Sequence, residues 1–70
     1  MQFDYSKLKG RIIEKFETYN AFADAMNFSK TRLSQRLNNE IEWKPSEIYQ
    51  AAQLLGLEDV TSYFFKPLAK

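Results

Sequence analysis

The side chains best suited to specific recognition lie close together in residues 29–39. This stretch combines Ser, Thr, Gln and Asn with Lys30, Arg32 and Arg36, and it contains no acidic residue. Hydroxyl and amide groups donate and accept hydrogen bonds, while Lys and Arg attract anions. Residues 17–28 carry a net charge of −2 and residues 40–59 a net charge of −4, so the stretch is the one purely basic window of a chain with net charge +1. The pattern predicts binding through hydrogen bonds and charge.

Catalysis has little support in the composition. The chain has no His and no Cys, so the usual general base, a thiolate nucleophile, a disulfide and the commonest metal ligands are absent. Paired carboxylates occur at Glu40 with Glu42 and at Glu58 with Asp59, in loop or cap positions without a catalytic neighbour. We therefore predict no enzyme activity, no cofactor and no metal site.

Length and hydropathy indicate a single domain over residues 1–70. A chain of 70 residues buries only about 60% of its unfolded surface, and 44% hydrophobic residues can supply a small, efficient core. No apolar run exceeds three residues, so no segment is expected to cross a membrane. The N-terminal residues lack the apolar run of a secretory signal, and a cysteine-free chain of this kind is expected in the cytoplasm.

The elements that position the polar stretch are predicted to be five helices and no strand. The spacing of apolar residues and the cap signals place them near residues 5–16, 19–26, 30–38, 45–55 and 58–64. Thr18 and Ser29 are expected N-caps, Pro45 suits a first helical position, and Gly56 is expected to end the fourth helix. The predicted core comprises Leu8, Ile12, Phe16, Phe22, Met26, Phe28, Leu33, Leu37, Ile48, Leu55 and Phe64, with Trp43 as a lid. Of Tyr63, Phe64 and Phe65, at least one is expected to be exposed.

The second and third predicted helices have the spacing of a helix-turn-helix over residues 18–38. Such a motif needs a small residue where its helices cross, and Ala23 stands there. It needs a residue that tolerates positive φ in the turn, which Asn27 supplies, and apolar residues at Phe28 and Leu33. We therefore expect an all-α fold built around this motif.

The third predicted helix has two distinct faces. Leu33 and Leu37 define its buried direction, so the opposite arc carries hydrogen-bonding residues instead of the usual Glu/Lys mixture. That arc contains Thr31, Ser34, Gln35 and Asn38, with Arg32 at its edge and Ser29 and Lys30 in the first turn. Gln and Asn can pair with adenine, Ser and Thr with several bases, and Arg or Lys with guanine or phosphate. A solvated face without a ligand is the alternative.

Residues 4–65 resemble the small Cro-type members of the phage repressor helix-turn-helix family, chiefly through the run from Phe22 to Leu33. The family's usual turn glycine is Asn27 here, and Leu37 follows Leu33 by four positions, as in Cro. The resemblance implies a repressor-like DNA-binding fold that reads double-stranded operator DNA, as a homodimer on two half-sites. It implies base reading by Ser29, Lys30, Thr31, Ser34 and Gln35, and phosphate contacts by Asn20, Arg32, Asn38 and Asn39.

The whole chain also resembles small proteins of the lysis–lysogeny switch of Gram-positive phages, which include an antirepressor that binds the phage repressor. This second resemblance implies a protein partner, the cognate repressor, in the host cytoplasm. The low net charge favours it, and the polar face of the third helix favours DNA. For the protein partner we expect Phe28, Arg32, Leu33 and Arg36 to act as apolar and charged anchors.

Overall fold

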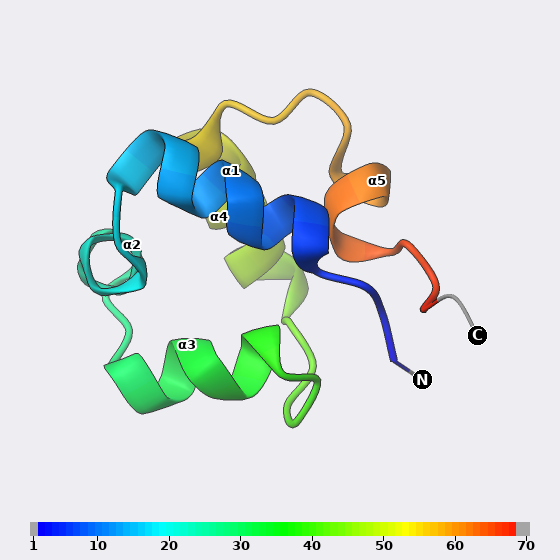
Figure 1. Ribbon diagram of the computed structural model, residues 1–70, viewed down its shortest axis with the longest axis horizontal. Helices are drawn as coiled ribbons and strands as arrows, with labels where there is room; N and C mark the ends of the chain where they lie inside the picture. Colours follow the sequence, from blue (N-terminus) through cyan, green and yellow to red (C-terminus); the bar gives the residue numbers. More distant parts are fainter. Residues whose placement is uncertain (1, 69–70) are drawn as a thin grey trace.

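The computed structural model describes residues 2–68, which form five helices. They are α1 (Ser6–Phe16), α2 (Tyr19–Met26), α3 (Lys30–Leu37), α4 (Pro45–Leu55) and α5 (Val60–Phe64), as Figure 1 shows. Within residues 2–68 there is no strand, only an isolated antiparallel bridge between Phe3 and Pro67. The all-α prediction is confirmed, and each predicted helix is present.

The helix ends follow from cap chemistry encoded in the sequence. The backbone N–H of Ala21 donates to Thr18 Oγ1 and that of Arg32 donates to Ser29 Oγ, both at 3.1 Å. Helices α2 and α4 end at residues in the left-handed region, Asn27 (φ 62°) and Gly56 (φ 65°), as expected. The last helix begins two residues later than predicted.

Asp59 explains that later start of α5. Its side chain accepts a hydrogen bond from the backbone N–H of Thr61 at 2.9 Å, which makes Asp59 the N-cap instead of a helical residue. Two other boundaries differ by one residue from the prediction: α1 begins at Ser6, one residue later, and α3 ends at Leu37, one residue earlier.

Helices α1, α2 and α4 pack on one another, with α3 on α2 and α5 on α1 and α4. Figure 1 shows α3 along one edge of the molecule, joined to α2 by a short turn and to α4 by a loop. Nine of the eleven predicted core residues are buried; Phe16 and Ile48 are half-buried at the margin. Trp43 is buried as the predicted lid, with its ring 5.0 Å from that of Phe64, and Phe65 is exposed. No helix among the described residues is long and apolar enough to cross a membrane.

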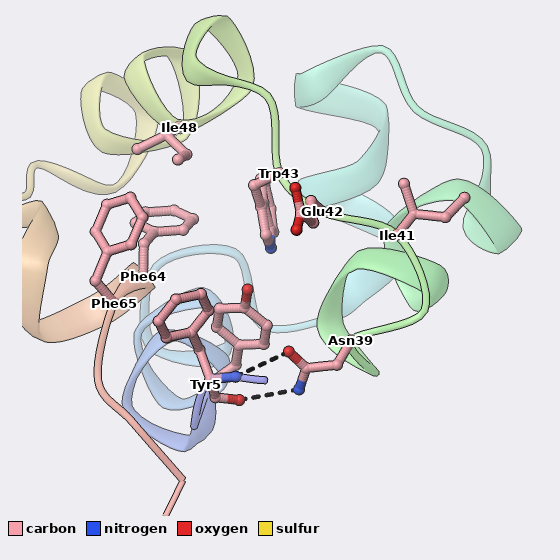
Figure 2. Close-up of a pocket in the computed structure, with 9 residues that line it drawn as sticks. Tyr5, Asn39, Ile41, Glu42, Trp43, Ile48, Phe64 and Phe65 are labelled. Atoms are coloured by element: carbon pink, nitrogen blue, oxygen red, sulfur yellow. Dashed lines mark hydrogen bonds between the residues drawn. The ribbon is translucent and has the colours of Figure 1, made fainter. Parts of the chain in front are cut away.

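The N-terminal segment is held on both sides by residues far away in the sequence. The backbone N–H of Asp4 donates to the carbonyl of Lys66 at 2.7 Å, next to the Phe3–Pro67 bridge. On the other side, Asn39 Oδ1 accepts from the backbone N–H of Phe3 at 3.0 Å, and Asn39 Nδ2 donates to the carbonyl of Phe3 at 2.9 Å (Figure 2). Tyr5 follows this segment and is 6% exposed, although the apolar periodicity did not identify it as a core residue.

Candidate functional site

The α2–turn–α3 segment has the geometry that the spacing predicted. Ala23 is 1% exposed, so its small side chain lies inside the packing. The turn is closed by the backbone N–H of Phe28, which donates to the carbonyl of Ala23 at 2.8 Å. Asn27 adopts positive φ between them. The two helices are therefore fixed relative to one another, and α3 presents a defined outer face.

The predicted base-reading residues lie together on that face. Ser29, Lys30, Thr31 and Ser34 are exposed, and Gln35 is half-buried. Asn38 is also exposed, and its Nδ2 donates to Ser34 Oγ at 3.1 Å. Within residues 2–68 Lys30 forms no ion pair. The structure thus brings these side chains together at the surface, while their contacts with DNA stay a prediction.

A groove of about 160 Å³ runs along one flank of this face, between α3 and the helices α1 and α2. Leu33 and Leu37 form its apolar floor. Its rim combines Lys9 of α1 with hydroxyl, phenol and amide groups of the other two helices. The lining residues are Lys9, Tyr19, Asn20, Lys30, Leu33, Ser34, Leu37 and Asn38. We call this groove together with the outer face of α3 the α3 surface.

The opposite flank of α3 holds a buried ion pair. Arg36 is 4% exposed and Glu47 is 6% exposed. Arg36 Nε donates to Glu47 Oε1 at 2.9 Å and Arg36 Nη2 donates to Oε2 at 3.1 Å, a bidentate arrangement. Glu47 Oε1 also accepts from the backbone N–H of Lys44 at 2.9 Å, which links the pair to the start of α4.

Burial acts to raise the pKa of Glu47, but the hydrogen bonds from Arg36 and Lys44 and the positive charges of Arg36 and Arg32 outweigh it. The pKa of this carboxyl therefore lies below its ordinary value, and Glu47 is ionised at neutral pH. One of the three positive charges of α3 is consequently neutralised inside the molecule.

The four residues expected to anchor a protein partner differ in their exposure. Phe28 and Arg36 are buried in the core and in the ion pair, whereas Leu33, although buried, lies on the floor of the groove. Their expected role as anchors for a partner stays a prediction. Only Arg32 is exposed, with 46% of its side chain accessible, and it lies 3.5 Å from Glu47 Oε2. Both guanidinium groups lie over the ring of Phe28, at 4.8 Å for Arg32 and 5.1 Å for Arg36. Packing on Phe28 and pairing with Glu47 account for this placement.

The residues expected to contact phosphate also differ in their accessibility. Asn20 and Asn38 are exposed on the α3 surface, and Arg32 is exposed on the opposite flank. Asn39 differs from them, because its amide oxygen and nitrogen both form hydrogen bonds with the backbone of Phe3. Its φ of 62° and these two bonds make it a structural residue that holds the N-terminal segment. Phosphate contacts by all four residues stay a prediction.

The sequence did not identify the two outer members of the groove. Neither Lys9 nor Tyr19 was predicted to contact a partner, although Tyr19 is 42% exposed. The signal for Tyr19 is its position directly after the N-cap, where a side chain lies at the end of the helix instead of over the core. Among residues 2–68 no cluster of three or more potential metal ligands occurs.

Comparison with known proteins places this geometry in context. A family model described as "Protein of unknown function (DUF739)" matches residues 1–67. The chain belongs to this family. A search of curated proteins found no match.

The chain is also similar to a protein of known structure. The chain is similar to the solution structure of the modulator of repression (MOR) of the temperate bacteriophage TP901-1 from Lactococcus lactis, with 43% sequence identity and a TM-score of 0.80. The similarity covers 93% of this chain and 90% of that chain. The predicted resemblance to phage lysis–lysogeny proteins is therefore confirmed at the level of this relative, and the Cro-type resemblance stays a prediction.

Proposed function

We propose that this chain is a modulator of a phage repressor, which binds the repressor through the α3 surface in the host cytoplasm and catalyses no reaction. The observation that carries the proposal is its similarity to the MOR protein over nearly the whole length of both chains. An antirepressor of this kind needs a surface that fits another protein, and the α3 surface offers an apolar floor with a polar rim.

The charge distribution supports a protein partner. DNA binding draws much of its affinity from Lys and Arg that neutralise phosphates. Arg36 is held in the buried pair and Arg32 lies over Phe28 near Glu47, so Lys30 is the one cation of α3 free of a carboxylate partner within residues 2–68. Glu40 and Glu42 are exposed just beyond α3, where a phosphate backbone near that helix end would meet them.

The test is to mix the chain with its cognate repressor without DNA and measure binding by size-exclusion chromatography and calorimetry. We expect a complex that Lys30→Glu weakens, because Lys30 lies on the groove rim and is exposed. Lys7→Glu is the matched control, since Lys7 is an exposed lysine of α1 that lies 4.7 Å from the ring of Tyr63, away from the groove. The absence of a complex, or equal effects of both variants, would contradict the proposal.

Operator binding is the second candidate, and the exposed polar face formed by Ser29, Thr31 and Ser34 favours it. On this reading a homodimer places α3 in successive major grooves of operator DNA. Gln35→Ala should then cost about 1–3 kcal/mol of discrimination at one base pair. Lys30→Ala should weaken binding to all sequences and reduce its salt dependence. A wild-type chain without operator preference at low salt would exclude this candidate.

A further inference from the structure

A second pocket, of about 280 Å³, lies beyond the C-terminal end of α3 and shares no lining residue with the groove of the α3 surface. Its walls come from the N-terminal segment, the loop between α3 and α4, and helices α4 and α5 (Figure 2). Aromatic side chains dominate the lining, among them Tyr5, Trp43 and Phe65. We call it the Trp43 pocket. Nothing in the proposed function uses it.

The indole N–H of Trp43 is the unusual feature of this pocket. Trp43 is 8% exposed, and its Nε1 is the one buried side-chain nitrogen or oxygen among residues 2–68 without a hydrogen-bond partner. Buried donors are normally paired, because an unsatisfied one carries a desolvation penalty. Figure 2 shows the nitrogen-bearing edge of the ring directed into the pocket, toward Tyr5. The nitrogen itself is covered, so Trp43 contributes the wall of the pocket and its indole resonance reports on what enters there.

The rim of the Trp43 pocket is acidic and apolar. Glu42 lines it and Glu40 lies two residues before; both are exposed and neither forms an ion pair within the described part of the chain. Burial and the negative charge of Glu42 raise the pKa of Tyr5, so the field of Glu42 reaches the pocket wall. Ile41 and Phe65, 42% and 44% exposed, add apolar surface to the rim.

These features select the chemistry of an occupant. The volume of the Trp43 pocket, about 280 Å³, lies just below the usual range for drug-sized molecules. One large side chain therefore fits it better than an extended small molecule. The exposed apolar rim would continue the contact along a polypeptide, as around an anchor residue in protein interfaces. The two carboxylates favour a cation next to the anchor and disfavour nucleic acid.

We propose that the Trp43 pocket binds a segment of a protein partner in which a large apolar side chain is flanked by Lys or Arg. The apolar side chain enters the pocket against the ring of Trp43, and the cation lies beside Glu42. The site is independent of the α3 surface, so it holds whether or not the repressor is the chain's partner.

The test uses nuclear magnetic resonance of the ¹⁵N-labelled full chain. Trp43 is the only tryptophan, so its indole N–H gives a single, assignable resonance. The probe is the capped tripeptide Lys-Leu-Lys, compared with capped Lys-Ala-Lys and capped Glu-Leu-Glu. We expect a saturable shift of the indole resonance with Lys-Leu-Lys, and weaker binding of both comparison peptides. No saturable shift up to millimolar peptide, or equal responses to all three peptides, would overturn the proposal.

Two variants locate the binding. Glu42→Gln should weaken Lys-Leu-Lys binding about two- to fivefold, the range of an exposed ion pair. Glu58→Gln is the matched control, because Glu58 is also exposed but does not line the pocket, and it should leave binding unchanged. An indole resonance that shifts with protein concentration before any peptide is added would show that a second copy of the chain occupies the pocket, and would overturn the proposal in favour of self-association. Because no repressor is used, failure here is distinguishable from failure of the proposed function.

Discussion

Replacing Arg36 by Met should show how much of the domain's stability depends on the buried ion pair. Met keeps most of the aliphatic stem but removes the guanidinium that donates to both carboxylate oxygens of Glu47, at 2.9 and 3.1 Å. The carboxylate, in a residue only 6% exposed, would retain the Lys44 N–H at 2.9 Å and the more distant Arg32 at 3.5 Å. The variant therefore leaves a buried charge with its weaker partners.

Removing one side of a buried pair costs about 3–5 kcal/mol, and the two remaining partners put the expected loss near the lower limit, at about 3 kcal/mol. A domain of 70 residues has a total stability of about 3.5–10 kcal/mol, so this loss is a large fraction of it. The melting temperature should fall by about 12–24 °C, measured by circular dichroism at neutral pH.

Two controls make the result specific to the unpaired charge. Arg32→Met removes a guanidinium that is 46% exposed near the same carboxylate, and should cost less than about 1 kcal/mol. Adding Glu47→Gln to Arg36→Met removes the buried charge but keeps an oxygen for the Lys44 N–H, so most of the stability should return. A melting temperature of Arg36→Met within a few degrees of wild type, or a double variant no more stable than the single one, would refute the reasoning.

Three further outcomes are expected from unfolding measurements. Ala23→Leu should lower stability by about 1–3 kcal/mol because Ala23 is 1% exposed, whereas Ala25→Leu on the exposed side of α2 should change little; equal effects would contradict the close packing. Asn39→Gly keeps the positive φ but loses both bonds to Phe3, and we expect a cost of about 1–3 kcal/mol; an unchanged denaturation midpoint would show that these bonds contribute nothing. The pKa of Glu47 is lowered in the folded state, so its stabilisation is fully present above its ordinary pKa of 4.5 and is lost as the pH falls through the lower folded value. If the stability of Glu47→Gln fell as steeply as that of wild type over this acidic range, Glu47 would not be the source of the pH dependence.

The helices and the turn were predictable because their determinants are local. The caps at Thr18 and Ser29 and the positive φ at Asn27 depend on residues within one turn of helix, and the period of the apolar residues predicts which side of each helix is buried. The same reasoning predicted the outer face of α3, since Leu33 and Leu37 define its opposite side.

The roles of Arg36 and Asn39 were not predictable from local pattern. Arg36 lies beside the polar arc on a helical wheel, and only the return of α4 brings Glu47 within 2.9 Å of it. Asn39 looks like a simple helix end until the N-terminal segment reaches its amide. Long-range polar contacts of this kind depend on tertiary packing, so charge counted along the sequence overestimated the positive potential of α3.

One wall of the Trp43 pocket is formed by the N-terminal segment, which is held in place by residues near the other end of the chain. Phe3 and Asp4 contact Pro67 and Lys66 on one side and Asn39 on the other, so the contact with Pro67 and Lys66 closes a loop that includes all five described helices. Closing so long a loop costs conformational entropy, which the contacts of the N-terminal segment must offset. A partner that binds the Trp43 pocket would therefore favour the folded chain over any form in which the N-terminal segment is displaced. Binding and folding would then be thermodynamically linked.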